Sequence, residues 1–302
     1  MAGWLLSFLS AGALTARQLA AVNRWVVATA ALSPYLMPAA PVAALVFALS
    51  RHWVPAAAAV ALTVTAVAAH LPWYIGGRQA EPGATVRFVT ANLYLGRAQP
   101  AAVATMALES ADIVAVQELT DELSAALSPL LAEDFPFSLL RPRDNAAGVG
   151  LWSRFPIIDS GSDESFSRGF IHARVRTPEA EVTVVSTHMP PPRSAFTSWR
   201  EDIRRLGRAL RTVAATGPVI VGSDLNATPD VREFRQLLHD GYRDGAAQAN
   251  AGLTMTYPCH TPLPPFLAVD HILTRDATAT SVRTVSVAGS DHLALAATVV
   301  LH

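Results

Sequence analysis

The stretch VIVGSDLNATPD, from Val219 to Asp230, gives the clearest indication of the fold and the functional site of this chain. Its opening run, Val219–Val221, is long enough for a buried strand, and the Gly-Ser pair that follows lets the chain turn at the strand's end. Asp224 and Asn226 come next, two residues apart, so extended backbone would place both side chains on one side. Thr228-Pro229-Asp230 then ends the strand and offers a start for a helix. An isolated D-x-N is more often a capped polar turn than a catalytic pair, so its neighbours must decide.

Charge is distributed unevenly along the 302 residues. Residues 1–80 contain four arginines and no acid, and the first acidic residue is Glu81. All 23 basic residues are arginine, so 19 of them face 24 Asp and Glu in residues 81–302, a formal balance of −5. Non-specific binding to duplex nucleic acid favours a basic domain and is therefore less expected. The single cysteine, Cys259, excludes an intrachain disulfide and a multi-cysteine zinc site.

The N-terminal part predicts a membrane anchor over residues 1–78. Residues 25–50 and 52–77 are two uncharged runs of 26 residues each, and a spanning helix needs roughly 20 apolar residues. The expected spans are Trp53–Leu71, Pro34–Ser50 after a proline-interrupted start, and a weaker third at Trp4–Val22, which contains Arg17. We therefore expect two or three transmembrane helices. A signal peptide over Met1–Ala16 is the alternative, but that stretch lacks a basic start and further apolar runs follow.

These spans predict a multi-pass protein of the cell membrane whose non-protein partner is the lipid bilayer; no protein partner is predicted. With three spans, Arg17, Arg24 and Arg78 lie on the side of the C-terminal domain, and Arg51 lies on the other. The positive-inside rule then mildly favours a cytoplasmic domain. Because Arg17 and Arg24 lie within or beside the first span, the side of the membrane stays open.

The composition changes at residues 79–84, which are predicted to form a linker. Over residues 85–302, the sequence predicts alternating helices and strands. Helices are expected at 101–110, 121–131 and 198–212. Strands are expected at 85–91, 112–116, 149–153, 171–175, 182–186, 218–222, 269–273, 281–287 and 294–301. Two strand–helix units followed by mostly strands predict a layered α/β domain with mixed sheets.

Polar residues recur where apolar runs end, which is where active sites of layered α/β proteins gather. They are Asn92, Glu118, His188, Asp224, Asn226, the Asp270-His271 pair and the Asp291-His292 pair. Each has an ordinary explanation when taken alone, such as a helix cap for Glu118 or a hydrogen-bonded surface histidine for His188. Their repeated placement favours one shared site.

Metal-assisted phosphoester hydrolysis is the chemistry that such a set fits. Mg²⁺ prefers carboxylate and amide oxygens, and Glu118 and Asp291 could supply the carboxylates. A histidine–aspartate pair could activate a water, and a second histidine could protonate the leaving oxygen or hold the phosphate. Signatures of rival mechanisms are absent from the sequence: it has no lysine-bearing phosphate loop, no H-E-x-x-H and no G-x-S-x-G.

Seven motifs in this order resemble those of the endonuclease/exonuclease/phosphatase family, which includes deoxyribonucleases, abasic-site nucleases, neutral sphingomyelinases and inositol-polyphosphate phosphatases. The resemblance covers roughly residues 84–302. The motifs are TANLYLG, DIVAVQEL, GLWSRFPI, VVSTHMPPP, GSDLNATPD, AVDHIL and GSDHLAL.

The resemblance implies a four-layer α/β sandwich, in which two mixed sheets lie face to face between helices, and an active site at one edge. It implies that Asn92, Glu118 and Asp291 surround a divalent metal, Mg²⁺ with Mn²⁺ as an alternative. It also implies that Asp224 and Asn226 orient the attacking water and the phosphate.

The remaining implied roles concern the two histidines. His292, paired with Asp270, is implied to be the general base or to stabilise the transition state, and His188 to contact the phosphate or act as an acid. Family members differ over whether the residue matching Asp224 or His292 takes the proton, so that choice stays open.

The expected function is a membrane-anchored, Mg²⁺-dependent hydrolase of phosphodiesters or phosphomonoesters: a nuclease, phosphodiesterase or phosphatase. Nucleic acid, phospholipid and inositol phosphate all stay open as substrates. The alternative is a catalytically inactive membrane-bound binding or scaffold module of the same fold. Inactive members usually lack a metal ligand or the final histidine, and this sequence retains them all.

Overall fold

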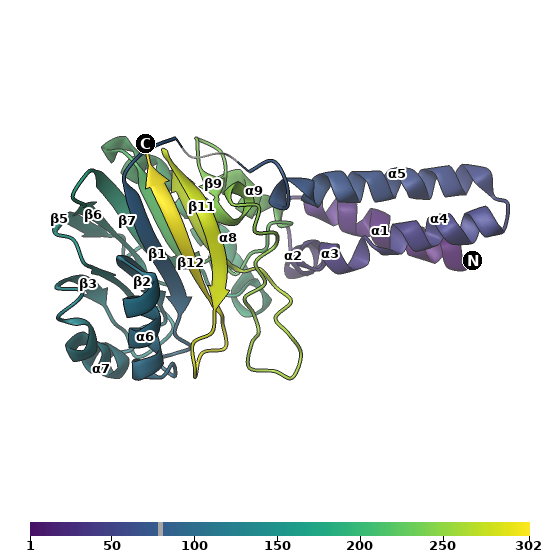
Figure 1. Cartoon of the computed structure of the whole chain (residues 1–302). Helices are drawn as coiled ribbons and strands as arrows, with labels where there is room; N and C mark the ends of the chain where they lie inside the picture. Colours follow the sequence, from purple (N-terminus) through teal and green to yellow (C-terminus); the bar gives the residue numbers. More distant parts are fainter. Residues whose placement is uncertain (78–80) are drawn as a thin grey trace.

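Two six-stranded sheets pack face to face in the C-terminal part of the computed structural model, which describes residues 1–77 and 81–302 (Figure 1). Arg78 and the first two residues of the expected linker lie outside the described residues. The first sheet has the order β11-β12-β1-β2-β4-β3. Its strands are β1 (Thr85–Asn92), β2 (Ile113–Gln117), β3 (Phe137–Arg141), β4 (Val149–Ser153), β11 (Ala277–Val285) and β12 (Ala294–Leu301).

The second sheet has the order β5-β6-β7-β8-β10-β9. Its strands are β5 (Ile157–Ser162), β6 (Phe170–Arg176), β7 (Glu181–His188), β8 (Val219–Asp224), β9 (Arg243–Asp244) and β10 (Asp270–Arg275). Both sheets are mixed, because β1–β2 and β7–β8 are parallel pairs while their other neighbours are antiparallel.

Helices cover the outer faces of the two sheets, so the predicted four-layer sandwich is confirmed. Helices α6 (Pro100–Ser110) and α7 (Asp121–Leu131) pack on the first sheet, and α8 (Pro192–Val213) and α9 (Arg232–Leu237) pack on the second. Two short elements complete the domain, namely η2 (Ala214–Thr216) and α10 (Gly245–Gln248).

Strand β8 shows how the sequence builds these layers. Its alternation sends Val219 and Val221 into the cluster beneath α8, and Ile220 into the cluster between the sheets. Gly222 faces the opposite sheet, where a Cβ would come within 2.8 Å of the Phe88 ring. A glycine therefore lets the sheets approach closely just before the site.

The expected helices and strands are present, with ends that differ by a few residues. Helix α8 starts at Pro192, six residues earlier than expected, but Ala195 has non-helical backbone angles and separates a short first turn from the long helix that was predicted. Strands β3, β5 and β9 and helix α10 were not anticipated. The helix expected after Thr228-Pro229-Asp230 is α9, which begins at Arg232. Asp230 does not cap it, because its carboxylate binds groups of the N-terminal helices instead.

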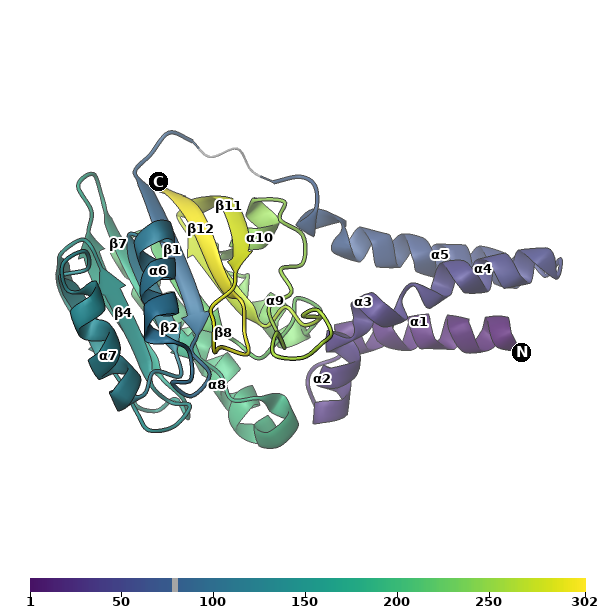
Figure 2. The same cartoon turned by 60° about the horizontal axis from the view of Figure 1, so that its bottom comes forward.

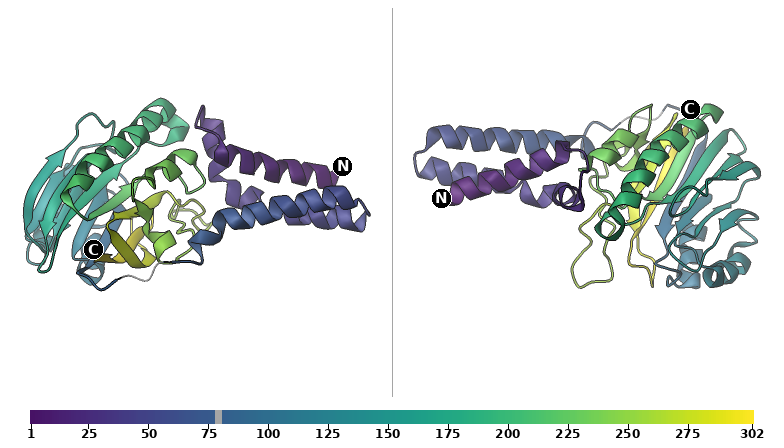
Figure 3. Two further views of the ribbon diagram at one scale, coloured as in Figure 1. Left: turned by 90° about the horizontal axis from the view of Figure 1, so that it is seen from above. Right: turned by 180° about the vertical axis from the view of Figure 1, so that it is seen from behind.

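The N-terminal helices form an elongated bundle that projects from the sandwich, as Figures 1–3 show from several sides. The turn between α4 and α5 lies at the far end of this bundle, and α2 and α3 lie at the end beside the sandwich. The elements are α1 (Ala2–Gln18), α2 (Arg24–Ala31), α3 (Ser33–Leu36), α4 (Ala39–Leu49), α5 (Trp53–His70) and η1 (Leu71–Trp73).

Among the described residues, one helix is long and apolar enough to cross a membrane, Trp53–Trp73; a second candidate is counted if the pair Arg24–Ala31 and Ser33–Leu49, bent by 57°, is taken as one span. The expected third span at Trp4–Val22 does not qualify. Helix α1 ends at Gln18, and its last turn carries Arg17, which is buried against the sandwich rather than placed in an apolar span.

Asp230 is the polar centre of the contact between the bundle and the sandwich. Its carboxylate accepts from Arg17 Nε at 2.7 Å and lies 3.0 Å from His70 Nε2. Nearby, the Ala21 N–H donates to Glu233 at 2.7 Å. The last residues of α1 and α5 are therefore held against the segment that follows β8.

Candidate active site

One edge of the sandwich collects the polar residues predicted from the sequence. β1, β2, β7 and β8 end there, and β10 and β12, which run antiparallel to them, begin there. The register pairs Asp224 with His188 on one side and with Asp270 on the other. All eight predicted site residues are linked at this edge by a continuous set of contacts: Asn92, Glu118, His188, Asp224, Asn226, Asp270, Asp291 and His292.

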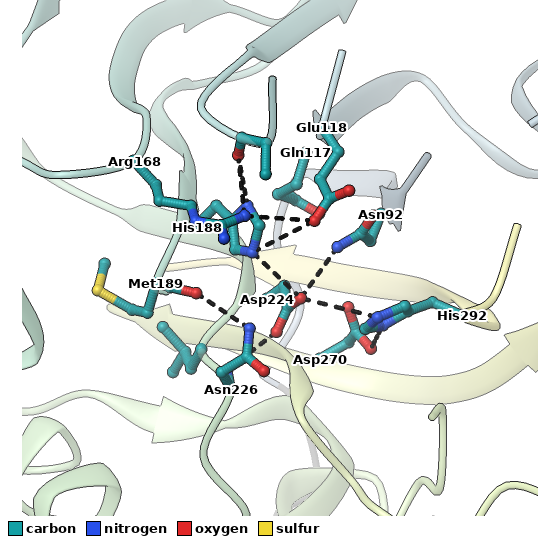
Figure 4. A network of polar contacts seen from close by, with 12 residues as sticks. Asn92, Gln117, Glu118, Arg168, His188, Met189, Asp224, Asn226, Asp270 and His292 are labelled. Carbon is teal, nitrogen blue, oxygen red and sulfur yellow. Dashed lines mark hydrogen bonds and ion pairs between the residues drawn. The ribbon is translucent and has the colours of Figure 1, made fainter. Parts of the chain in front are cut away.

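Asp224 lies at the centre of this set, with a side chain that is 1% exposed (Figure 4). Its Oδ2 accepts from Asn92 Nδ2 at 3.0 Å, and its Oδ1 accepts from the Asn226 N–H at 2.9 Å. Two histidines approach the same Oδ2, His188 Nε2 at 3.5 Å and His292 Nε2 at 3.9 Å. Burial, followed by the Asp270 charge, raises the pKa of Asp224 to about 7.

His292 and Asp270 form the predicted pair, with His292 Nδ1 2.8 Å from Asp270 Oδ2. Burial alone would lower the pKa of His292, but Asp270 and, after it, Asp224 raise it to about 10. The imidazole is therefore protonated at neutral pH. Tyr257 packs against it, with 4.7 Å between ring centroids, and Asp291 Oδ1 lies 3.9 Å from its Nε2.

Glu118 stands directly after β2 in a left-handed conformation, with φ of +59°. A non-glycine residue held there is a form of backbone strain that functional sites often carry. Its Oε2 accepts from the Leu95 N–H at 2.7 Å, and its Oε1 lies 3.4 Å from Arg168 and 3.8 Å from His188. Burial raises the pKa of Glu118 even though Leu95 and Arg168 oppose the shift.

His188 is buried at the end of β7, and its two ring nitrogens have different surroundings. Nδ1 lies 2.9 Å from the Ala146 carbonyl, which can only accept, so Nδ1 carries a hydrogen. Nε2 faces the Glu118 and Asp224 carboxylates. Burial and then Arg168 hold the pKa of His188 well below its usual value, so the ring is neutral and Nε2 presents a lone pair to the site.

Asn226 also has a left-handed backbone, with φ of +47°. Its Nδ2 donates to the Met189 carbonyl at 3.0 Å, which fixes the plane of the carboxamide. The D-x-N motif is therefore both a capped turn and part of the site. Asp224 caps its own turn by accepting from the Asn226 N–H, and both side chains lie at the site edge.

Two groups of residues have the chemistry of a metal site. The first is Asp224, Asp270 and His292, whose ligand atoms lie within 4.8 Å of one another. The second is the predicted set of Asn92, Glu118 and Asp291, which offers oxygen atoms only. In the first set, His292 Nδ1 is bonded to Asp270, so only Nε2 could bind a metal, and only in the deprotonated ring. The second set offers the oxygen ligands that a hard cation prefers, and its role as the metal site is a proposal.

Burial also makes the carboxylates of the second set suited to a cation, as it does for Asp224 of the first set. The pKa values of Glu118 and Asp291 are both raised, and burial is the largest cause for each. Raised values mean that these carboxylates lack full compensation for their charge, which a divalent ion would provide.

Two neighbours of the site were not identified from the sequence. Arg168, just before β6, approaches Glu118; its only signal is an isolated arginine ahead of a strand. Gln117 donates from Nε2 to Ser186 Oγ at 3.3 Å and to the Gly222 carbonyl at 3.4 Å, and so joins the two sheets beneath the site. A glutamine within the buried run IVAVQ was the available signal for it.

Comparison with solved structures supports the fold. Humanized D. rerio TDP2 with 14 mutations superposes with a TM-score of 0.61 at 16% identity, covering 71% of this chain and 98% of that one. An endonuclease/exonuclease/phosphatase from Bacteroides vulgatus gives 0.60 at 17% identity, covering 72% and 100%. Sphingomyelinase C from Streptomyces griseocarneus gives 0.52 at 18% identity, covering 71% and 99%. These likenesses show the sandwich fold alone.

Sequence comparison is more specific. None of the curated proteins matches the chain significantly. The model of the Endonuclease/Exonuclease/phosphatase family matches residues 89–292, which include every residue of the set linked around Asp224. The chain belongs to the endonuclease/exonuclease/phosphatase family.

Proposed function

We propose that this protein is a membrane-anchored, divalent-metal-dependent phosphoesterase that hydrolyses phosphodiester or phosphomonoester bonds. Members of its family are phosphoester hydrolases. The observation that carries the proposal is the arrangement around Asp224: a buried carboxylate between two histidines, beside a second carboxylate, Glu118, that is suited to a cation.

Asn92, Glu118 and Asp291 would hold the metal, Mg²⁺ or Mn²⁺. When bound, such an ion polarises a phosphoryl oxygen and stabilises the negative charge that develops on it. Asn92 also donates to Asp224, so the same side chain links the metal site to the group proposed to act on water.

Asp224 is the proposed general base. Asn226 and Asn92 fix its two oxygens, and its raised pKa, about 7, suits a group that accepts a proton near neutral pH. As the water oxygen bonds to phosphorus, its proton passes to the Asp224 carboxylate, and the bond to the leaving oxygen breaks so that this oxygen departs with the bonding electron pair as an oxyanion. His292 is already protonated between Asp270 and Asp224, so it donates to the phosphoryl oxygens and stabilises the transition state.

His188 is proposed to bind the phosphate. An anion beside Nε2 favours the protonated ring, because a nearby opposite charge stabilises the charged form. The ring would then donate from Nε2 to the phosphate while Nδ1 keeps its bond to the Ala146 carbonyl. Asn226, held by the Met189 carbonyl, lies beside the same position.

Membrane anchoring is the second part of the proposal. It is supported by the one apolar helix of sufficient length, the bent pair, and the lack of acidic residues before Glu81. Residues 1–78 would anchor the chain as a multi-pass protein of the cell membrane, with 79–84 as a linker and 85–302 as the catalytic domain. Fractionation of cells expressing the full chain tests this: retention in the membrane pellet after a carbonate wash is expected, and release contradicts it.

Hydrolysis of methyl p-nitrophenyl phosphate by the full chain tests the catalytic part. Activity is expected with Mg²⁺ and is expected to fall by about 10²–10⁴-fold in Glu118→Gln and in His292→Ala. Arg211→Ala, at an exposed position on α8, is the control and should keep wild-type activity. Activity unchanged by both site substitutions would rule out the assigned residues.

A further inference from the structure

A cavity of about 680 Å³ lies between the N-terminal helices and the catalytic domain. One wall is α2, which contributes Trp25, Val27 and Ala28; the opposite wall comes from the domain and includes Leu267 and Val269. α2 is fixed in place, because Val27 and Ala30 belong to the same apolar cluster as Trp199 of α8. Figure 2 shows α2 at the end of the bundle nearest the domain.

This cavity borders the active site. Asn226, which hydrogen-bonds Asp224, and Tyr257, which packs on His292, are among its lining residues. A molecule with its phosphate at the site could therefore extend a substituent along α2.

The lining has the chemistry of an amphiphile's binding site. Most of its residues are apolar, and its two charged residues are both cationic, Arg24 and Arg193. This sign is opposite to the formal balance of residues 81–302, and it complements a phosphate. Apolar walls with a few convergent polar groups are typical of small-molecule sites.

Thr228 gives an independent indication of a ligand. It is 4% exposed, it lines the cavity, and its hydroxyl has no hydrogen-bond partner among the described residues. A buried hydroxyl without a partner is costly, and a polar atom of a bound molecule would remove that cost.

We propose that this cavity binds the aliphatic chain of a phospholipid-like substrate whose phosphoester lies at the active site, so that the N-terminal segment forms part of the substrate site. The proposal rests on the proposed phosphoesterase function. A nucleotide fits less well, because the polar edges of its base would face the largely apolar walls contributed by α2, Leu267 and Val269.

Three p-nitrophenyl phosphodiesters that share one leaving group test the proposal: the methyl, octyl and thymidine 5′ esters. The full chain in lipid nanodiscs with Mg²⁺ is expected to show a kcat/KM at least roughly tenfold higher for the octyl than for the methyl ester, because burial of several CH₂ groups favours binding. The thymidine ester should gain no such advantage.

Ala28→Trp fills the cavity from an exposed position of α2. It is expected to reduce kcat/KM for the octyl ester about tenfold and to leave the methyl ester within about twofold. Val22→Trp adds the same ring outside the cavity, at a residue that is 63% exposed, and should leave both esters unchanged.

The outcomes separate this inference from the proposed function. Equal kcat/KM for the methyl and octyl esters, or a preference for the thymidine ester, overturns the lipid site while phosphoesterase activity stands. No hydrolysis of any ester overturns the proposed function. In that case binding still tests the cavity: octyl phosphate should quench the tryptophan fluorescence of the wild type, and not that of Trp25→Phe, at lower concentration than methyl phosphate does. Equal binding of the two overturns the inference.

Discussion

Asp224 and Asp230 belong to one stretch of twelve residues, yet they serve two different regions of the molecule. Asp224 ends β8 and faces the sandwich edge, where two histidines and a carboxamide surround it. Asp230 is equally buried, but it binds Arg17 and His70 of the N-terminal helices. The first carboxylate lacks a close cationic partner that fully compensates its charge, and the second has one at 2.7 Å.

This difference indicates that Asp224 belongs to a reactive site, whereas Asp230 joins two regions of the structure. Burial without full compensation raises the pKa of Asp224 to about 7, a value useful for proton transfer. A close arginine pairs with Asp230 and joins the two regions. Substitutions at the two positions should therefore have opposite signatures, one in activity and the other in stability.

Asp224→Asn gives the largest expected effect. The carboxamide keeps the shape of the side chain but cannot accept the proton from water, so kcat should fall by roughly 10³-fold or more. The melting temperature should stay level or rise, because a buried and poorly compensated charge is removed. Steady-state kinetics and thermal unfolding measure the two quantities, and a stable variant with wild-type kcat would remove Asp224 from catalysis.

Asp230→Ala should weaken the contact between the N-terminal helices and the sandwich. It leaves Arg17 buried without its carboxylate, and breaking a buried pair costs about 3–5 kcal/mol. Thermal unfolding of the full chain in detergent should show a lower melting temperature. The exposed pair Arg211–Asp240 is the matched control, and Arg211→Ala should change the free energy of unfolding by no more than about 1 kcal/mol. Similar losses from both variants would argue against Asp230 as the anchor.

The pH dependence of kcat/KM should report the titration of Asp224 and of His292. Asp224 must be deprotonated to act as a base, so activity should rise as pH increases through about 7. His292 must be protonated to stabilise the transition state, so activity should fall as pH increases through about 10. Asp270→Asn removes the main cause of the raised pKa and should move the falling limb to lower pH. If the falling limb does not move, it does not report the titration of His292.

Arg168→Gln should give the smallest effect. Its guanidinium lies 3.4 Å from Glu118 and therefore repels a cation bound there. Removing that charge should tighten apparent Mg²⁺ binding by roughly two- to fivefold. Mg²⁺ titration of activity measures this change, and weaker binding would mean that Arg168 supports the site by holding Glu118 in place.

Much of the sandwich could be predicted because its strands are apolar runs that end in polar motifs. The run VIV followed by GSDLN specified both β8 and its place at the site edge. The site set was accessible for the same reason: strand ends bring Asn92, Glu118 and His188 together whatever the intervening loops do.

Other features depend on contacts between segments far apart in the sequence. Nothing near Arg168 in the chain indicates Glu118, and nothing near Asp230 indicates Arg17, which lies 213 residues away. Strand β5 (IIDSGS) alternates poorly, because it is an edge strand with several exposed residues. The expected span at Trp4–Val22 is absent for a reason that hydropathy could not reveal. Its Arg17 holds the bundle against the sandwich.

The position of the metal is the most direct test of the account. Isothermal titration calorimetry of the full chain with Mg²⁺ or Mn²⁺ compares wild type with Glu118→Gln and with Asp270→Asn. We expect one divalent ion per chain in the wild type, loss of binding in Glu118→Gln, and retention in Asp270→Asn. Retention in Glu118→Gln with loss in Asp270→Asn would place the ion among Asp224, Asp270 and His292 and contradict the account. No binding to the wild type would favour an inactive scaffold.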